Sequence, residues 1–307
     1  TMYRANQIAR SEPTGPVYVC FDAGLQEEAL TEEIHIPDAS KFLPSDPPRA
    51  SEIAVAEVAD LLLAAKSPVL MIGRSNRTQE GWDNRIKLAE AVGAGVMTNL
   101  RNAAVFPSEH PLHIGRPAGG VNPPMRAAIA AADVVVSLNW LDFGGTQRLL
   151  KRDGAIKGKI VHCSLEQYLH TGYGMELYEL PESDVNVNAD QDAFVGQLLA
   201  EIERRGAAST WDGKSVGPEP ESYEAIANRP ADGSIEPADI VTALAEAQGD
   251  RQISLNRVAS GGMGPAYKIT DPLSYLGHDG GGGLASGPGT SVGAALAVKG
   301  TGWLPVA

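Results

Sequence analysis

Residues 132–138 read Ala-Asp-Val-Val-Val-Ser-Leu, and residues 67–73 read Ser-Pro-Val-Leu-Met-Ile-Gly. Both runs are apolar at almost every position and lack the alternation that is typical of a strand with one face in water. Such runs predict strands that are buried on both faces, as in a parallel sheet covered by helices. These two stretches therefore decide the fold class.

Further strands and amphipathic helices alternate on either side of these runs. Apolar strands are predicted at 95–98, 159–164 and 185–187, and helices at 82–92, 124–132 and 191–204. Ser51 is a predicted N-cap for a helix to residue 65, whose apolar positions are Ile53, Val55, Val58, Leu61 and Leu62. We predict one complete α/β domain over residues 51–205, with a parallel, Rossmann-like sheet and helices on both faces.

Shorter segments flank this domain. Residues 4–11 are predicted as the end of a helix and 17–21 as a short buried strand, and the proline-rich 38–50 as a linker. A second linker covers 206–232, where Trp211 and Tyr223 are expected to pack on a neighbour.

A third region covers 233–307, with a helix that starts near Pro237 and buries Ile240, Leu244 and Ala247, a strand at 252–255 and a helix at 291–298. We expect the apolar residues 303–307 to lack a strand partner, and both ends of the chain to be cuts within a longer protein.

Composition excludes several classes of function. The net charge of -13 argues against nucleic acid as a partner, because phosphate binding needs a basic surface. No apolar stretch approaches 18 residues and no signal pattern is present, so we expect no membrane segment and no export. Cys20 and Cys163 lie in apolar runs, where we expect both thiols to be buried and reduced in a cytoplasmic protein.

A glycine-rich turn into a small-residue helix is the strongest local feature. Residues 277–297 read Gly-His-Asp-Gly-Gly-Gly-Gly-Leu-Ala-Ser-Gly-Pro-Gly-Thr-Ser-Val-Gly-Ala-Ala-Leu-Ala. Glycines before a helix let the backbone approach a ligand and leave N–H groups for phosphate. The run lacks the Gly-Lys-Ser/Thr of a phosphate-binding P-loop and the acidic residue of a dinucleotide site. A flexible loop or a tight helix-packing contact is the alternative.

The order of these pieces resembles the acetolactate synthase and benzoylformate decarboxylase superfamily of thiamine-diphosphate-dependent enzymes. Residues 282–297 are similar to the entry helix of its diphosphate-binding domain, and residues 15–22 to the closing strand of its pyrimidine-binding domain. Residues 67–73, 110–115 and 132–138 resemble segments of its central domain. The resemblance implies that 1–37 end a pyrimidine-binding domain and that 233–307 begin a diphosphate-binding domain.

The resemblance also implies residues that hold the coenzyme. In the family, a bulky apolar residue forces thiamine diphosphate into a V shape. The resemblance gives this role to Leu284, which follows Gly283. It also implies that the backbone carbonyl of Gly282 accepts a hydrogen bond from the aminopyrimidine. Ala259 and Ser260 match the stretch that contacts the diphosphate. His278 and Asp279 match positions on the substrate side, where histidine serves as an acid or base. Each of these residues also has a structural alternative. Leu284 is then an ordinary core residue, Ser260 a turn serine, and His278 and Asp279 a loop pair that makes local hydrogen bonds.

Other motifs are weaker. His110 and His113 flank Pro111, for which a structural role is expected, and Arg116 lies in a glycine-rich stretch that holds an anion or forms a surface loop. The residues Ser164-Leu165-Glu166 and Asn139 depart from the flavin-binding pattern of true acetolactate synthases. We therefore expect a central domain that acts as a spacer without FAD or ADP.

Two parts of the family machinery are not found in this chain. They are the glutamate that activates the coenzyme and the Gly-Asp-Gly motif that begins the Mg²⁺ site, which should start near Ala307. We thus expect no metal ligand within residues 1–307 and no catalysis by this chain alone.

The sequence is compatible with three functions. The first is part of a thiamine-diphosphate-dependent, Mg²⁺-requiring lyase, decarboxylase or transferase that acts on a 2-keto acid or related carbonyl and assembles as a homodimer or homotetramer. The second is an NAD-, FAD- or ADP-binding module formed by 51–205. The third is a non-catalytic assembly subunit.

Overall fold

The computed structural model describes residues 1–115, 117–152, 156–166, 179–216, 233–235, 237–256, 267–277 and 286–306. The helices are α1 (Met2–Arg10), α2 (Ala23–Glu27), η1 (Ala39–Lys41), α3 (Glu52–Ala64), α4 (Gln79–Val92), α5 (Pro123–Ala131), α6 (Phe143–Lys151), α7 (Gln191–Arg204), α9 (Pro237–Gln248) and α10 (Ser286–Ala297). The strands are β1 (Pro68–Ile72), β2 (Gly95–Thr98), β3 (Val134–Leu138), β4 (Lys159–Cys163), β5 (Val185–Val187), β6 (Ile253–Leu255) and β7 (Leu304–Val306).

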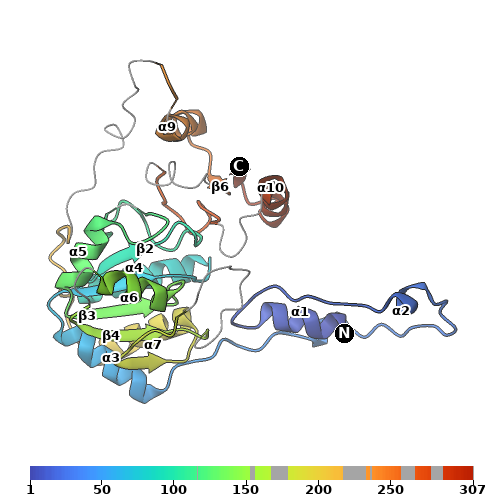
Figure 1. Ribbon diagram of the computed structural model, residues 1–307, viewed down its shortest axis with the longest axis horizontal. Coiled ribbons are helices and arrows are strands. Elements are labelled where there is room, and N and C mark those ends of the chain that lie inside the picture. The colour runs from blue at the N-terminus through green and yellow to red at the C-terminus, as the bar shows by residue number, and fades with distance from the viewer. Residues whose placement is uncertain are drawn as a thin grey trace.

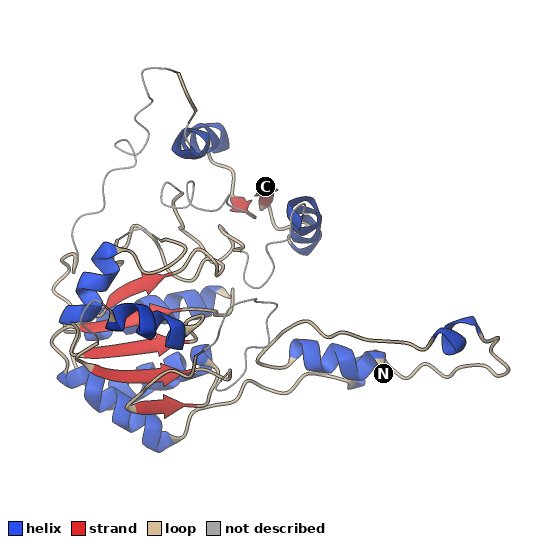
Figure 2. Ribbon diagram, viewed as in Figure 1, coloured by secondary structure: helices blue, strands red, loops and turns tan. Residues whose placement is uncertain are grey.

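The first five strands form one parallel sheet in the order β2-β1-β3-β4-β5. Helices cover both faces of this sheet (Figures 1 and 2). The side chains of β1 explain why both faces are covered. Leu70 and Ile72 lie in an apolar cluster formed with α3, α4 and α7. Val69 and Met71, on the opposite face, lie in a second cluster formed with α5 and α6. A strand with two buried faces must be apolar throughout, as the sequence predicted.

Side-chain caps set the helix starts in this domain. The Ser51 hydroxyl accepts from the Ala54 N–H at 3.2 Å, which confirms the predicted N-cap of α3. Asn122 and Asp190 cap α5 and α7 in the same way. Each cap satisfies backbone donors that the first helical turn leaves without partners. Helix α6 was not predicted, because Gly144 and Gly145 at its start are typical of a turn rather than a helix.

The C-terminal region packs on the central domain through a third apolar cluster. β6 and β7 are parallel neighbours, and Leu255 also bridges to Tyr275. The Ala104 N–H donates to the Tyr275 carbonyl at 2.8 Å, and the Tyr275 hydroxyl donates to the Leu100 carbonyl at 2.6 Å. The expectation that residues 303–307 lack a strand partner was wrong, since β7 pairs with β6.

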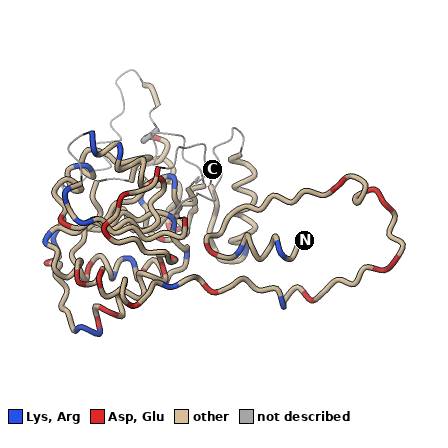
Figure 3. The backbone as a smooth tube through the Cα atoms, turned by 60° about the horizontal axis from the view of Figure 1, so that its bottom comes forward, with Lys and Arg blue, Asp and Glu red and all other residues tan. Residues whose placement is uncertain are grey.

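Residues 1–46 form an arm that extends from the body of the molecule and carries α1 and α2 (Figure 1). Acidic residues gather on its distal part (Figure 3). The predicted buried strand at 17–21 was wrong, because these residues form no strand and Tyr18 is 90% exposed. Cys20 is likewise exposed, whereas Cys163 is buried as predicted. An apolar run forms a strand only where a neighbouring strand satisfies its backbone groups.

Two helices bury different residues from those expected. In α9, Val241 is buried while Ile240 and Ala247 are exposed, because the third cluster contacts the helix along the Val241 side. In α3, Ile53 is exposed although Val55, Val58 and Leu62 are buried. Trp211 packs against the first cluster, as expected, and Tyr223 lies outside the described residues.

Candidate functional site

The carboxyl ends of three parallel segments meet at one edge in the C-terminal region. β6 ends at Leu255, residues 275–276 run beside it, and the Leu276 N–H donates to the Leu255 carbonyl at 2.9 Å. On the other side, the Asn256 N–H donates to the Val306 carbonyl of β7 at 2.7 Å. Ligands of parallel sheets bind outside the carboxyl ends of the strands. We call this the β6 edge, and it is our candidate site.

All the sequence-predicted site residues follow directly from this edge along the chain. Ala259 and Ser260 come soon after Asn256, whereas His278, Asp279, Gly282, Gly283 and Leu284 come soon after Gly277. These seven residues lie outside the described ranges, so their positions are not part of the structure. What the structure does show is that the segments directly before the two stretches, which end at Asn256 and Gly277, are adjacent.

Two buried asparagines at this edge have side-chain atoms that find no hydrogen-bond partner among the residues that the structure describes. Asn256 is fully buried and donates from Nδ2 to the Ser291 hydroxyl of α10 at 3.3 Å, but its Oδ1 accepts no hydrogen bond. Asn102, on the loop after β2, lacks partners for both Oδ1 and Nδ2. Buried polar atoms are rarely left unpaired, and such atoms in a native fold call for an explanation. Sequence analysis missed both residues, although a polar residue directly after an apolar strand was the available signal for Asn256.

The central sheet has its own switch point, between β1 and β3, where the strand order reverses and a nucleotide would be expected. There the backbone closes the crevice. The Gly73 N–H donates to the Leu138 carbonyl at 2.8 Å, and the Arg74 N–H donates to the Asn139 carbonyl at 3.1 Å. A Cβ at residue 73 would lie 1.8 Å from the Asn139 carbonyl oxygen. The loops that follow β1 and β3 therefore touch directly beyond the ends of these two strands.

Side chains fill the space next to this closed crevice. Arg74 pairs with Glu166 at 2.6 Å, and the Ser164 hydroxyl donates to Asn139 Oδ1 at 2.8 Å. Glu166 is thus turned toward a guanidinium group of the protein rather than a ribose. Asn139 itself adopts a left-handed conformation, with φ of 52°, which asparagine tolerates better than most residues.

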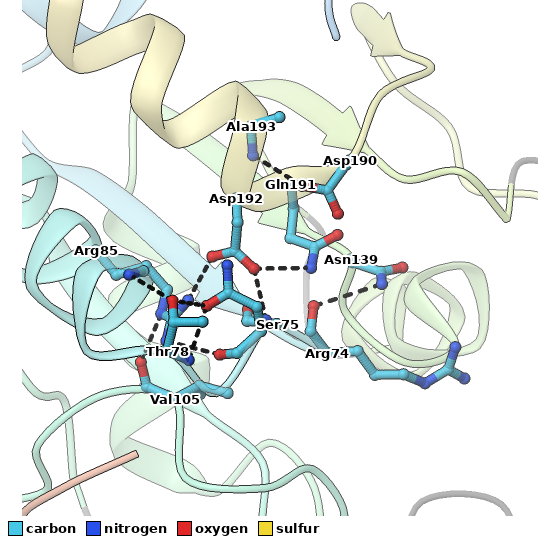
Figure 4. A network of polar contacts seen from close by, with 12 residues as sticks. Arg74, Ser75, Thr78, Arg85, Val105, Asn139, Asp190, Gln191, Asp192 and Ala193 are labelled. Atoms are coloured by element: carbon cyan, nitrogen blue, oxygen red, sulfur yellow. Dashed lines mark hydrogen bonds and ion pairs between the residues drawn. The ribbon is translucent and has the colours of Figure 1, made fainter. Parts of the chain in front are cut away.

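A buried ion pair lies between α4 and α7 (Figure 4). Arg85, 1% exposed, pairs with Asp192 and donates through Nε to the Val105 carbonyl at 2.8 Å. The Asn76 N–H donates to the same carboxylate at 2.6 Å. Burial lowers the pKa of Arg85, while the Asp192 charge opposes this shift. All these groups bond within the protein, so we regard the pair as structural.

A cavity of about 240 Å³ lies beyond the carboxyl ends of β2 and β3. Arg101 and Arg126 line it, together with Gly119, Gly120 and Trp140. Arg116, for which the sequence left an anion contact and a surface loop as alternatives, lies outside the described residues. The guanidinium groups give this cavity a positive character, while Asp142, which caps α6, adds one negative group.

The two histidines near Pro111 have structural partners. His113 is buried and bonds to the Thr98 hydroxyl at 2.9 Å and to the Gly115 carbonyl at 2.7 Å. His110 contacts Glu90 at 3.2 Å and packs against the Trp211 ring. Within the described ranges, no group of three or more His, Cys, Asp or Glu side chains is arranged to hold a metal ion. None of the helices that the structure describes is long and apolar enough to span a membrane.

Comparison with known proteins gives consistent results. Residues 55–167 match the family described as thiamine pyrophosphate enzyme, central domain. The chain is 25% identical over 268 residues to acetolactate synthase from Mycobacterium bovis, which covers 85% of this chain and 41% of the relative. It is 24% identical over 247 residues to acetolactate synthase from Mycobacterium avium, covering 80% of this chain and 34% of the relative. The chain thus spans between 34% and 41% of the length of these two relatives.

Two solved structures share the fold. One is described as a thiamin diphosphate-dependent enzyme from Mycobacterium smegmatis, with a TM-score of 0.68 at 19% identity, covering 99% of this chain and 55% of that one. The other is benzoylformate decarboxylase from Polynucleobacter necessarius, with a TM-score of 0.66 at 18% identity, covering 99% and 54%. The predicted fold class, a parallel α/β domain with helices on both faces and flanking parts, is confirmed.

Proposed function

Since this chain carries the central domain of a thiamine pyrophosphate enzyme of the acetolactate synthase and benzoylformate decarboxylase superfamily, we propose that it is part of an enzyme that cleaves or forms carbon–carbon bonds of 2-keto acids. The observation that supports this most directly is the β6 edge, because the segments that directly precede both coenzyme motifs in the sequence are parallel neighbours there. The lyase, decarboxylase and transferase classes all use this chemistry.

The described residues of the β6 edge fit thiamine diphosphate. No donor among the described residues reaches the buried Asn256 Oδ1, which lies beside Ser291 on α10. This acceptor is therefore open to a donor of the coenzyme, such as its amino group, and not to the diphosphate oxygens, which only accept. When bound, thiamine diphosphate would supply a nucleophilic carbon for the substrate carbonyl and a positively charged ring that takes up the electrons of the cleaved bond.

We assign the coenzyme contacts by sequence resemblance. Ser260 and Ala259 bind the diphosphate, Leu284 supports the bent coenzyme, and Gly282 and Gly283 bring the backbone close to it. His278 and Asp279 face the substrate and exchange protons with it. We place the Mg²⁺ ligands outside this chain and therefore expect residues 1–307 alone to be inactive.

Substitution of Ser260 tests the coenzyme site. We expect Ser260→Ala in the intact protein to weaken thiamine diphosphate binding about tenfold in calorimetry with Mg²⁺ present, because a hydrogen bond to a charged group is lost. Thr301→Ala is the matched control, since the Thr301 hydroxyl is exposed and donates to the Val298 carbonyl at 2.7 Å. A wild-type protein that binds no thiamine diphosphate would contradict the proposed function.

The nucleotide-binding alternative is less well supported, because backbone hydrogen bonds close the switch point of the central sheet. We propose that the central domain binds no NAD, FAD or ADP there and acts as a spacer. Calorimetric titration of the chain with each nucleotide checks this, and a micromolar dissociation constant for any of the three would restore the alternative. The thiamine diphosphate titration also tests the third alternative, because a subunit with only an assembly role has no need to bind the coenzyme.

We further propose a cytoplasmic homo-oligomer, a dimer or tetramer with the coenzyme between subunits. Both cysteines are free thiols, which suits a reducing compartment. The exposed apolar side chains of the arm suit burial against another domain or subunit. Light scattering on the intact protein measures the oligomeric state.

A further inference from the structure

The cavity of about 240 Å³ beyond the carboxyl ends of β2 and β3, which we call the β2/β3 cavity, has no role in the proposed function. Asn99 follows β2 directly and Trp140 follows β3, so the cavity lies at the edge of a parallel sheet where ligands commonly bind. Helices α5 and α6, which contribute Arg126 and Thr146 to its lining, pack against the same face of this sheet.

Asn99 offers this cavity a hydrogen-bond donor. The residue lines the cavity and is only 7% exposed. Its Oδ1 accepts from the Arg101 N–H at 2.8 Å, which fixes the orientation of the amide group. Within the described part of the chain Nδ2 finds no acceptor, and unlike both amide atoms of Asn102 it is not sealed from solvent. An amide donor in so buried a residue favours a ligand that supplies an acceptor.

The backbone around Asn99 is held from two sides. The Leu100 N–H donates to the Ala118 carbonyl at 2.9 Å, and the Leu100 carbonyl accepts from the Tyr275 hydroxyl at 2.6 Å. A donor on a segment fixed in this way loses little conformational freedom when a ligand binds. The mouth of the cavity is open at Gly119 and Gly120, because a Cβ at either position would meet nothing within 4 Å.

The charges of the lining favour an anion. Arg101 and Arg126 contribute two guanidinium groups. Both arginines have further interactions in the chain, but a guanidinium group carries five N–H donors and can bind a ligand in addition. Asp142 is the acidic side chain of the lining, and its Oδ1 already accepts from the Gly145 N–H at 3.0 Å. Positive groups therefore outnumber negative ones around the cavity.

The apolar part of the lining and the small volume narrow the class of anion. Trp140, Leu141 and Leu150 are buried side chains on the cavity wall. Inorganic phosphate would leave this wall without a contact, whereas a short hydrocarbon chain would remove it from water. The volume is below the range of about 300–1,000 Å³ that is typical of sites for larger ligands such as nucleotides.

We propose that the β2/β3 cavity binds a small aliphatic carboxylate. Asn99 Nδ2 and the guanidinium groups of Arg101 and Arg126 donate to the carboxylate oxygens, which only accept and so match a set of donors. The hydrocarbon chain packs against Trp140 and Leu150. This inference does not depend on the proposed function, and it gives the central domain a ligand in addition to its role as a spacer.

Calorimetric titration of the intact protein with butyrate, without thiamine diphosphate, tests this site. We expect a dissociation constant on the order of 1 mM for butyrate. Butyramide has the same shape without the charge and should bind at least about tenfold more weakly. Asn99→Asp keeps the acceptor for the Arg101 N–H but replaces the donor with a second acceptor, so it should abolish binding.

Two arginine variants complete the comparison. Arg126→Gln should weaken butyrate binding about tenfold, because a charged donor is lost. Arg148→Gln is the matched control, since Arg148 lies on α6 outside the cavity lining and pairs with Glu179 at 2.6 Å. It should bind butyrate as the wild type does.

Each outcome supports or overturns the site. A wild type that does not bind butyrate, or folded Asn99→Asp and Arg126→Gln proteins that bind it as tightly as wild type, would overturn it. Tighter binding of inorganic phosphate or ADP than of butyrate, lost in the same variants, would overturn the carboxylate assignment. If Asn99→Asp does not fold, the half-buried Arg126 decides through its own variant. Failure to bind thiamine diphosphate would overturn the proposed function and leave this site unaffected.

Discussion

Asp190 is a buried N-cap whose protonation should be visible in stability. Its carboxylate accepts from the Ala193 N–H at 2.8 Å, and burial raises its pKa to about 6. The folded protein therefore binds a proton more tightly than the unfolded chain between pH 3.8 and 6, so this group lowers stability as pH rises through that window. Burial lowers the pKa of His162 to about 4, which has the opposite effect and raises stability from pH 4 to 6.5.

Asp190→Asn separates these two opposing effects. Asparagine keeps the cap but carries no charge. We expect the unfolding free energy of the variant to increase relative to that of the wild type as pH rises from 4 to 7. The increase in this difference should be on the order of 2 kcal/mol. Urea denaturation at several pH values measures this difference. Asp212→Asn, at an exposed residue paired with Lys214, is the control. If the unfolding free energies of Asp190→Asn and wild type differ by the same amount at every pH from 4 to 7, the raised pKa of Asp190 is refuted.

At the scale of elements, the contact between the ends of β1 and β3 determines whether the central sheet has an open crevice. We expect Gly73→Ala to lower the unfolding free energy by about 2 kcal/mol or more, because its Cβ would overlap the Asn139 carbonyl. Gly196→Ala in α7 meets nothing within 4 Å and should stabilise by about 0.5–1 kcal/mol. Urea denaturation compares the two alanines, and equal effects would show that the crevice is not tightly closed.

At the scale of the whole molecule, the arm is weakly anchored and exposes many large apolar side chains. Nine of its large hydrophobic side chains are exposed, namely Met2, Ile8, Tyr18, Phe21, Leu25, Leu30, Ile34, Ile36 and Leu43. Monomeric proteins seldom expose so many apolar groups in one segment, which supports a covering domain or subunit. The firm attachment begins only at Pro48, whose carbonyl accepts from the Asp190 N–H at 2.9 Å.

Truncation tests this view of the arm. Deletion of residues 1–46 should change the unfolding free energy of the central domain by less than about 1 kcal/mol, since no arm residue is buried. Deletion of 1–50 should destabilise further, because Ala50 exchanges two hydrogen bonds of 2.9 Å with Gln197. Thermal unfolding of both truncations provides the measurement. A large loss from the shorter deletion would mean that the arm packs on the body in solution.

Sequence patterns sufficed for the central domain and for the family resemblance. Val134–Val136 are apolar on both faces, and Ser51 is followed by an apolar helical period, so local composition alone specified strand and helix there. The candidate site was less accessible to such reasoning. Asn102 is an ordinary loop residue in the sequence, and nothing in its neighbours shows that its amide is buried without a partner.

What the sequence by itself determined was the parallel α/β domain, because a strand buried on two faces has to be apolar whatever helices cover it. Only the tertiary structure decided that Val17–Phe21 forms no strand, that Gly73 closes on Asn139, and that Asn102 is unpaired beside Gly277. The physical reason is that burial and hydrogen bonding depend on tertiary contacts between segments that are distant in the sequence, and local sequence does not specify those contacts.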